Sequence, residues 1–309
     1  MTHTILGAGG SIGIPLAQTL LTNHKQVKLV SRKGFAMEGA HSICADLLQY
    51  EQVQESVKGS EIVYLCAGLP YDLKIWQDQW PKVMRNTIDA CKKHSAKLVF
   101  LDNVYMYGLV HGKMTENTPY NPCSKKGEVR ARITLMLQEE IQNKNIDAII
   151  ARAADFYGPY TKQNSLPDIF VISKFLKGQK ANWGISENKL HTFSYTIDTA
   201  KGMYMLAQNS ECYGQVWHLP VCPQPITGKE IIELIAKEMA VKPDYMVIKK
   251  WMMQMAGLGS KTIREVIEML YQNEHDYLFD SSKFNSHFSF SPISYERGVK
   301  ETVQYFKTK

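Results

Sequence analysis

The chain has 309 residues, with 36 Lys and Arg against 30 Asp and Glu, so its formal net charge is +6. This length allows one large α/β unit or two unequal domains. A hydrophobic share of 44% and a charged share of 21% are typical of a globular protein and argue against a disordered chain, a coiled coil or a collagen-like repeat. The basic residues form no long run, so the charge predicts no nucleic-acid partner and suits a small anionic ligand as well.

Targeting and metal-binding patterns are also missing from the sequence. No apolar run reaches the roughly 20 residues of a membrane-spanning helix, and the N-terminus has no basic region ahead of an apolar one. The six cysteines are scattered without a CxxC pair or a metal-ligand spacing, which favours free thiols over disulfides. We therefore expect a cytoplasmic protein without a metal site or a membrane contact.

Short apolar runs alternate with amphipathic stretches through the first half of the chain. Strands are expected over residues 4–6, 27–30, 61–66, 97–101 and 147–151, and helices over 14–22, 81–94 and 127–142. This alternation predicts an α/β fold, a Rossmann-type doubly wound parallel sheet with helices on both faces.

The second half has a looser pattern with more turn residues. A helix is expected over residues 227–239, with Thr227 as N-cap and Glu230 at the capping-box spacing. We therefore expect a nucleotide-binding domain over residues 1–158 and a smaller C-terminal α+β substrate domain over residues 159–309, with a soft boundary across which segments can interleave.

Residues 251–256 and 263–271 form a helical region rich in methionine and other apolar side chains. Methionine adapts to irregular surfaces, which would suit a pliable lid over an apolar part of the substrate. The alternative, which we favour, is that the region belongs to the core of the second domain.

The most informative motif is a glycine loop, G-x-x-G-x-x-G, formed by Gly7, Gly10 and Gly13 between an expected strand and an expected helix. Glycines permit a tight turn and a close approach of the backbone to a pyrophosphate, and a helix N-terminus offers N–H groups to phosphates. Ser11 and Ile12 complete the loop. We expect it to bind a dinucleotide, although a glycine-rich turn without chemical meaning is the alternative.

The end of the second strand distinguishes NAD from NADP. NAD-binding folds usually place Asp or Glu there, about 20 residues beyond the loop, for the ribose 2′-hydroxyl. This chain has Ser31, Arg32 and Lys33 instead, without a carboxylate. Ser31 and Arg32 therefore favour NADP with NAD still possible, unless the turn is simply a solvated basic one.

Taken in order, further segments give the chain a resemblance to the extended short-chain dehydrogenase/reductase superfamily, in its NAD-dependent epimerase/dehydratase branch. Asp46 and Leu47 resemble its adenine-contact turn, and Ala67 and Gly68 resemble a segment beside the cofactor. The other similar segments are residues 104–108, 152–159, 192–200, 280–283 and 298–305. The resemblance implies an oxidoreductase or epimerase acting on a hydroxyl/carbonyl pair of a small polar, sugar-like substrate.

The catalytic pattern of that superfamily is incomplete in this chain. The pattern is a Ser or Thr followed by Tyr-x-x-x-Lys, in which tyrosine is the acid/base and lysine lowers its pKa and binds the nicotinamide ribose. The Ser/Thr position is Asn103, whose amide can still donate a hydrogen bond. Four residues before Lys125 and Lys126 stand Asn121 and Pro122, so the tyrosine is absent.

The resemblance leaves three residues as catalytic candidates. Asn103 would orient the substrate oxygen, and Lys126 would hold the ribose and tune the acid/base, as in the isoflavone-reductase-like branch, which is similar in relying on lysine without the tyrosine. Tyr107 is the candidate for proton transfer, with Tyr105, Tyr120 and Cys123 as substitutes. The plain alternatives are a strand-end turn residue at 103, a surface lysine at 126 and a packing residue at 107.

Two more titratable groups, Asp155 and His191, flank the expected cleft, although hydrogen-bonded structural roles are common for such residues.

The helices over 81–94 and 127–142 resemble those that pair in the homodimers of the superfamily. Loss of the tyrosine leaves one alternative to an enzyme, a non-catalytic NADP-binding module for redox sensing or regulation. The expected cofactor-binding set is Gly7, Gly10, Ser11, Ile12, Gly13, Ser31, Arg32, Asp46, Leu47, Ala67, Gly68 and Lys126.

Overall fold

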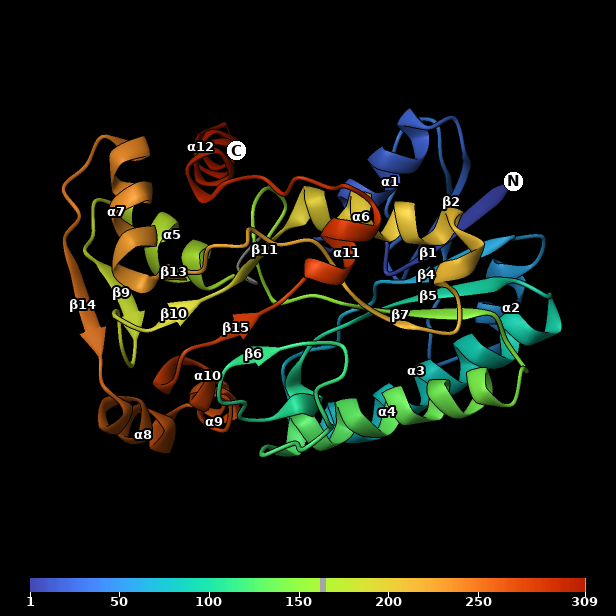
Figure 1. The fold of residues 1–309 in the computed structure, drawn as a ribbon, viewed down its shortest axis with the longest axis horizontal. Helices are drawn as coiled ribbons and strands as arrows, with labels where there is room; N and C mark the ends of the chain where they lie inside the picture. The colour runs from blue at the N-terminus through green and yellow to red at the C-terminus, as the bar shows by residue number, and fades with distance from the viewer. Residues whose placement is uncertain (162–164, 309) are drawn as a thin grey trace.

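A computed structural model describes residues 1–161 and 165–308 of the chain. Its largest sheet contains seven parallel strands in the order β12-β7-β5-β4-β1-β2-β3 (Figure 1). The strands are β1 (Thr2–Leu6), β2 (Gln26–Ser31), β3 (His41–Cys44), β4 (Ile62–Leu65), β5 (Lys97–Asp102), β7 (Ala148–Arg152) and β12 (Val216–His218). The expected doubly wound parallel sheet is therefore confirmed.

Helices cover both faces of this sheet. One face carries α1 (Gly13–Thr22), α6 (Thr196–Gln208) and α11 (Ser282–His287), and the other carries α2 (Tyr50–Val57), α3 (Leu73–Lys93) and α4 (Lys125–Gln142) (Figure 1). Strand β4 is buried along its whole length, and β7 likewise. A strand buried on both faces needs a continuous apolar run, and this explains why the apolar runs near residues 62–65 and 148–151 lack alternation.

Helix α3 begins eight residues earlier than the expected start at Pro81. Asp72 caps it, because its side chain accepts hydrogen bonds from the backbone N–H groups of Lys74 and Ile75. Pro81 lies inside the helix and only removes the bond to the carbonyl of Gln77. The buried residues Trp76 and Trp80 pack under this first part of the helix, so tertiary burial outweighs the proline.

The second half of the chain adds a strand to the large sheet and builds a separate layer. β12 pairs with β7, and α6 packs against α1, so residues after 158 take part in the nucleotide-binding unit. This interleaving follows from the short connection between α6 and β12, which returns the chain to the sheet edge. The division at residue 158 remains an approximate one.

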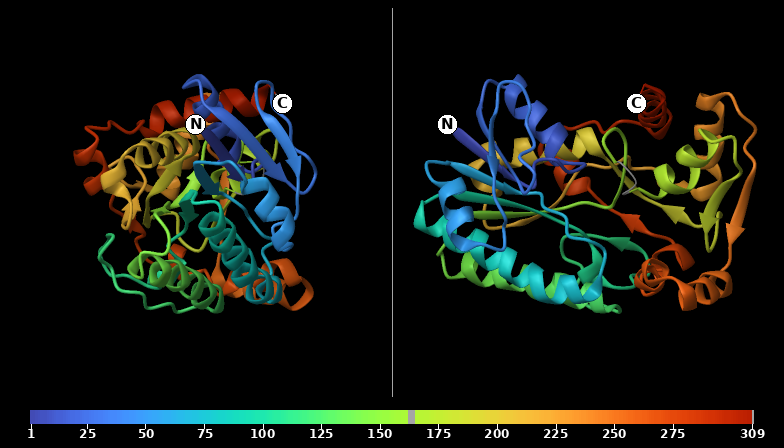
Figure 2. Two further views of the ribbon diagram at one scale, coloured as in Figure 1. Left: turned by 90° about the vertical axis from the view of Figure 1, so that its right-hand side faces the viewer. Right: turned by 180° about the vertical axis from the view of Figure 1, so that it is seen from behind.

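Most of the remaining elements form the smaller unit at the far end of the molecule, which we call the C-terminal unit (Figures 1 and 2). Its strand pairs are β8 (Asp155–Tyr157) with β11 (Phe193–Tyr195), β9 (Ala181–Gly184) with β14 (Tyr245–Ile248), β10 (Leu190–His191) with β13 (Ile226–Thr227), and β6 (Lys113–Met114) with β15 (Leu278–Phe279). Its helices are α5 (Ser173–Phe175), α7 (Gly228–Met239), α8 (Lys250–Gly259), α9 (Lys261–Ile267), α10 (Tyr271–Glu274) and α12 (Tyr295–Lys307), together with the short turn η2 (Asp168–Ile172). Two further short turns, η1 (Tyr105–Tyr107) and η3 (Ser210–Cys212), pack against α4 and α6 of the nucleotide-binding unit.

The start of α7 and the exposure of α8 bear on two expectations from the sequence. The capping box of Thr227 and Glu230 at the start of α7 is confirmed. The interpretation of the methionine-rich region as core is wrong for α8, since Trp251, Met255 and Leu258 are 65%, 62% and 74% exposed. Across the described residues, no helix combines the length and the apolar character that crossing a membrane requires.

Candidate active site

The glycine loop connects β1 to α1 at the carboxyl edge of the sheet. The backbone N–H groups of Gly7 and Ala8 both donate to the carbonyl of Val30 at the end of β2. Gly7 has φ +92°, and a Cβ atom there would lie 2.5 Å from the Cα of Ala67. A Cβ on Gly13 would lie 2.6 Å from the carbonyl oxygen of Ala8. Both glycines are therefore required by the backbone, whether or not a ligand is bound.

The N-terminus of α1 is open toward a ligand. Ile12 occupies the N-cap position without a side-chain hydrogen bond, and the first turn contains no acidic residue. The backbone N–H of Ile14 already donates to the carbonyl of Gly10 over 3.1 Å. The other N–H groups at such a helix start need partners from outside the helix, and phosphate oxygens suit them. Gly10 and Ser11 lie on the same loop, where the Ser11 hydroxyl donates weakly, over 3.4 Å, to the carbonyl of Thr161.

The turn after β2 presents a basic side chain. Arg32 is exposed and makes no ion pair with a described residue. The hydroxyl of Ser31 accepts a hydrogen bond of 2.7 Å from the backbone N–H of Phe35. Phe35 in turn lies against Gly9 of the glycine loop. This contact holds the turn, with its exposed guanidinium, beside the loop.

Two more predicted cofactor residues lie after β3. The carboxylate of Asp46 accepts a hydrogen bond of 3.0 Å from the backbone N–H of Leu48, and this fixes the turn that contains Leu47. After β4, Ala67 closes against Gly7, whereas a Cβ on Gly68 would meet no atom within 4 Å. Gly68 thus has open space beside it, as a residue at a ligand-binding edge needs.

Asn103 follows β5 at the same edge of the sheet. Its side-chain oxygen accepts a hydrogen bond of 3.1 Å from the backbone N–H of Tyr105, and its own backbone N–H donates to Asp102 over 2.9 Å. The side chain is half-buried, and its amide N–H groups make no hydrogen bond with a described residue. The free amide can donate to a bound oxygen atom.

Beneath Asn103 lies a buried charge network that the sequence did not reveal. Asp102 is 3% exposed and accepts hydrogen bonds from Arg130 and, over 2.8 Å, from the Thr134 hydroxyl. The guanidinium of Arg152 lies 3.6 Å from the other side of the carboxylate. One carboxylate thus compensates two buried guanidinium groups, and the network fixes the end of β5.

Tyr107 belongs to a buried network that shares Arg152 with the network around Asp102. It is 1% exposed, and its oxygen accepts a hydrogen bond of 2.6 Å from Arg152. The Nε2 atom of His218 lies 2.8 Å from the same oxygen, and the Nδ1 atom of His218 lies 2.8 Å from the carbonyl of Asp280. Burial raises the pKa of Tyr107 to about 12. Both sides of the hydroxyl are occupied, which argues against the proton-transfer role that we expected.

Lys126 is completely buried, and its partners come from the C-terminal unit. Its Nζ atom donates to Oε2 of Glu265 over 2.5 Å, to the carbonyl of Glu265 over 2.9 Å and to Oε1 of Glu268 over 2.7 Å. The ring of Tyr71 lies 4.7 Å from the same atom. The ammonium therefore has a full set of partners, and no free donor points to a ribose in this conformation.

Asp155 and His191 form a pair where the two units meet. Nε2 of His191 lies 3.0 Å from Oδ2 of Asp155. The imidazole is 3% exposed and is stacked between Phe193 and Tyr277, with ring centroids 4.4 Å and 4.3 Å away. The Asp155 side chain keeps 26% of its surface exposed. It is the member of the pair that solvent or a ligand can reach.

Tyrosines from distant parts of the chain surround this carboxylate. Burial raises the pKa of Tyr105, Tyr271 and Tyr277, and the charge of Asp155 adds to the effect in each case. Tyr71 and Tyr105 share a hydrogen bond. No motif in the sequence could have found Tyr71, Tyr271 or Tyr277, because the fold alone brings them together. The result is a cluster of largely buried phenols beside one accessible carboxylate.

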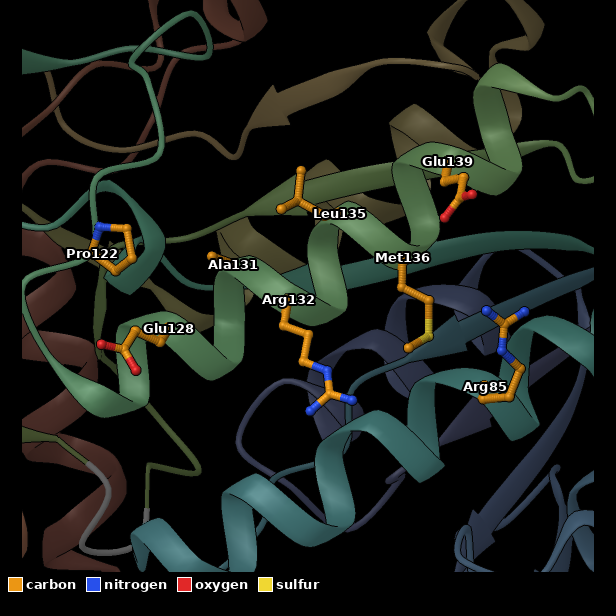
Figure 3. Close-up of a pocket in the computed structure, with 8 residues that line it drawn as sticks. All are labelled: Arg85, Pro122, Glu128, Ala131, Arg132, Leu135, Met136 and Glu139. Atoms are coloured by element: carbon orange, nitrogen blue, oxygen red, sulfur yellow. The ribbon is translucent and has the colours of Figure 1, made fainter.

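A separate groove is lined by residues of α3 and α4 and by Pro122 (Figure 3). Its lining residues are Arg85, Pro122, Glu128, Ala131, Arg132, Leu135, Met136 and Glu139. Leu135 is 53% exposed there. The groove contains none of the predicted catalytic or cofactor residues.

Among the described residues, no cluster of His, Cys, Asp or Glu could hold a metal ion.

A glycine loop at the carboxyl edge of a seven-stranded parallel sheet, beside an uncapped helix N-terminus, defines a dinucleotide-binding protein of the Rossmann class. A sequence model of the NAD dependent epimerase/dehydratase family matches residues 3–217. The chain belongs to this family, as the motifs predicted. Membership favours an enzyme and does not favour a non-catalytic module.

Individual relatives are distant in sequence. An uncharacterized UDP-glucose epimerase of Bacillus subtilis, YtcB, is 22% identical over 229 residues, which cover 66% of this chain and 71% of the relative. A dTDP-glucose 4,6-dehydratase of Streptomyces niveus is 21% identical over 71% of this chain, and only 60% of its own length is covered. The crystal structure of UDP-glucuronic acid 4-epimerase from Bacillus cereus in complex with NAD matches 100% of this chain and 97% of its own with a TM-score of 0.82 and 19% identity. This last likeness shows the fold.

Proposed function

We propose that the protein is an NAD(P)-dependent oxidoreductase or epimerase of an atypical extended short-chain dehydrogenase type. It would act on a hydroxyl/carbonyl pair of a small polar substrate. The observation that carries the proposal is the glycine loop between β1 and α1, which leads into a helix start without a side-chain cap or an acidic residue in its first turn. Family membership over residues 3–217 supports it.

The residues around the loop suit a nicotinamide dinucleotide. The loop and the start of α1 would bind the pyrophosphate, Asp46 and Leu47 the adenine side, and Ala67 and Gly68 the edge next to the nicotinamide. Exposed Arg32 and the absence of a carboxylate after β2 favour NADP over NAD. The relatives solved with NAD keep NAD as the second candidate.

The chemistry would be divided between cofactor and protein. When bound, the nicotinamide would accept or return the hydride. Asn103 would donate its free amide hydrogen to the substrate oxygen. Asp155, hydrogen-bonded to His191 and partly exposed, would hold or move the proton that the missing tyrosine would otherwise carry. His191 would orient the carboxylate.

A nucleotide sugar is the substrate class that the relatives suggest. Proteins named for UDP-glucose, UDP-glucuronic acid and dTDP-glucose occur among them. A mildly basic chain with tyrosines beside an accessible carboxylate suits a phosphorylated sugar, whose ring can pack on aromatic faces and whose phosphates need cations or N–H groups.

We also propose a homodimer that pairs through α3 and α4. The groove in Figure 3 and the exposed Leu135 on its rim offer an apolar contact area on this face. Size-exclusion chromatography with light scattering would test the proposal, and Leu135→Glu should shift the protein to monomer.

The decisive experiment is a fluorescence titration of the purified protein with NADPH and NADH. We expect saturable binding of at least one, and binding of neither would contradict the proposal. Incubation with oxidised cofactor and UDP-glucose, UDP-glucuronic acid or dTDP-glucose, followed by chromatography, would then test turnover. Asp155→Asn should keep cofactor affinity and lose turnover, whereas Asp147→Asn, at the start of β7, should keep both.

A further inference from the structure

The strongest unexplained feature of the molecule is the partnership of Lys126 with two glutamates of the C-terminal unit. A catalytic lysine of this superfamily is expected to face the cofactor. Here its ammonium makes three hydrogen bonds, all to Glu265 and Glu268. Both carboxylates come from the end of the α8–α9 hairpin, residues 250–268, which we call the cover segment.

The same glutamates also bind the starts of two helices of the nucleotide-binding unit. Glu265 accepts a hydrogen bond of 2.9 Å from the backbone N–H of Leu73, the first residue of α3. Glu268 accepts one of 2.7 Å from the backbone N–H of Lys125, the first residue of α4. Figure 1 shows α9 beside these helix ends, with α8 on the far side of α9. Negative charge is favourable at helix N-termini, so both contacts reinforce the pairing with Lys126.

Apolar packing contributes little to the position of the cover segment. Gly257 is the only buried residue of α8, and α9 has none. A further ion pair, Lys261 with Asp72, ties α9 to the cap of α3. Among the described residues, the hydrogen bonds and ion pairs between the cover segment and the nucleotide-binding unit thus all involve Glu265, Glu268 or Lys261. Segments with few buried apolar contacts open at low free-energy cost, and here polar contacts hold the segment in place.

The two ends of the segment are fixed more firmly. At one end it follows β14, which pairs with β9. At the other end, Met269 and Leu270 are each 4% exposed. A segment that is anchored at both ends and held by polar contacts between them can open and close without unfolding of the unit to which it belongs.

We propose that Glu265 and Glu268 latch the cover segment over the site by holding Lys126, and that release of this latch frees Lys126 toward the cofactor. The glutamates are positioning residues in this scheme. While the latch is closed, the charge of Lys126 is compensated by the two carboxylates and its donors are occupied. When the segment lifts, the ammonium loses these partners and can donate to hydroxyl groups of a bound ribose.

Hydrogen–deuterium exchange tests the latch without any ligand. Lys126→Met and the double variant Glu265→Gln/Glu268→Gln should each raise exchange in residues 250–268 at least tenfold, with β4 and β5 unchanged. Adding Lys126→Met to the double variant should raise exchange little further, because Lys126 acts on the segment only through Glu265 and Glu268. Lys125→Met and Glu128→Gln are matched controls, because both side chains lie exposed on the same helix as Lys126. Both variants should leave exchange as in wild type. Unchanged exchange in both test variants would overturn the proposal.

The link to the cofactor rests on the proposed function and has its own measurement. Stopped-flow mixing with NADPH and NADH should give an association rate several-fold higher in Glu265→Gln/Glu268→Gln, because the segment opens more often. A raised exchange rate with an unchanged association rate would overturn the coupling and leave the latch intact. Failure of the wild type to bind either nucleotide would instead contradict the proposed function, and the exchange result would still decide the latch.

Discussion

The hydroxyl of Tyr107 and Nε2 of His218 lie 2.8 Å apart in the buried region between the sheet and the C-terminal unit. Since Nδ1 of His218 faces the carbonyl of Asp280, Nδ1 must carry the hydrogen, and Nε2 must accept. The Tyr107 hydroxyl therefore donates to His218 and accepts from Arg152. This chain of three groups fixes a neutral histidine and orients an arginine that also faces Asp102.

Removal of the Tyr107 hydroxyl should destabilise the protein without touching the cofactor site. Tyr107→Phe leaves the acceptor of His218 and one donor of Arg152 without partners, at a cost of about 1–3 kcal/mol in the free energy of unfolding. Urea unfolding measures this cost. NADPH affinity should stay within twofold of wild type, and a large loss of affinity at unchanged stability would return Tyr107 to the site. Tyr50→Phe, whose hydroxyl makes no hydrogen bond with a described residue, is the control.

The neutral form of His218 makes stability depend on pH below neutrality. Burial lowers the pKa of His218 to about 3, against an unfolded value of about 6.5. Between these pH values only the unfolded chain takes up the proton. The contribution of neutral His218 to the free energy of unfolding is therefore fully present above about pH 6.5 and decreases as the pH falls. The expected loss is up to about 1.4 kcal/mol per pH unit. His3, whose pKa is lowered to about 4 mainly by burial, adds to it.

Urea unfolding between pH 7 and pH 5 isolates this effect. Carboxylates with lowered pKa values, such as Glu140 at about 2 beside Lys92 and Arg85, bind protons in the unfolded state mainly below this window. His218→Gln should lose part of the slope, whereas His24→Gln, at an exposed position, should keep it. An equal slope in wild type and His218→Gln would mean that another group controls the dependence.

The parts of the fold that could be predicted are those that depend on short patterns of neighbouring residues in the sequence. The continuous apolar runs of β4 and β7, the glycine loop and the capping box of Thr227 depend on neighbours within a few residues. Each of these was found correctly. The family assignment was possible for the same reason, because it rests on short motifs in a fixed order.

The parts that could not be predicted depend on contacts between distant segments. Lys126 lies 139 and 142 residues from Glu265 and Glu268, and no spacing rule connects them. The apolar run around Trp251 indicates a helix correctly, but apolar composition alone does not say which side is covered. The gathering of tyrosines around Asp155 has the same cause, since it follows from the placement of the two units.

Gly7 should tolerate no side chain, even in the absence of cofactor. In Gly7→Ala the methyl group would lie 2.5 Å from the Cα of Ala67 at a φ of +92°. We expect a loss of stability on the order of 1–3 kcal/mol from the backbone conformation, with the clash adding to it. Thermal unfolding and NADPH titration measure the two consequences. Gly184→Ala has open space and should change neither, and a Gly7→Ala variant with wild-type stability would show that the loop can move aside.

The choice between NADP and NAD should depend on Arg32. A 2′-phosphate at the end of β2 would form charge-assisted hydrogen bonds with the guanidinium, and a carboxylate in its place would repel the phosphate and accept from a ribose hydroxyl. We expect Arg32→Asp to lower NADPH affinity by roughly 10- to 100-fold, in line with about 1.5–3 kcal/mol for hydrogen bonds to charged groups. NADH affinity should stay equal or rise.

The control for this prediction is Lys33→Asp, which makes the same change of charge one residue further along an exposed turn. If general attraction of the anionic cofactor were the cause, both variants would weaken NADPH and NADH alike, and the loss would shrink for both as salt increases. If Arg32 holds the 2′-phosphate, only Arg32→Asp should change the ratio of the two affinities. A ratio that favours NADH in wild type would assign the turn to NAD and make Arg32 a solvated residue.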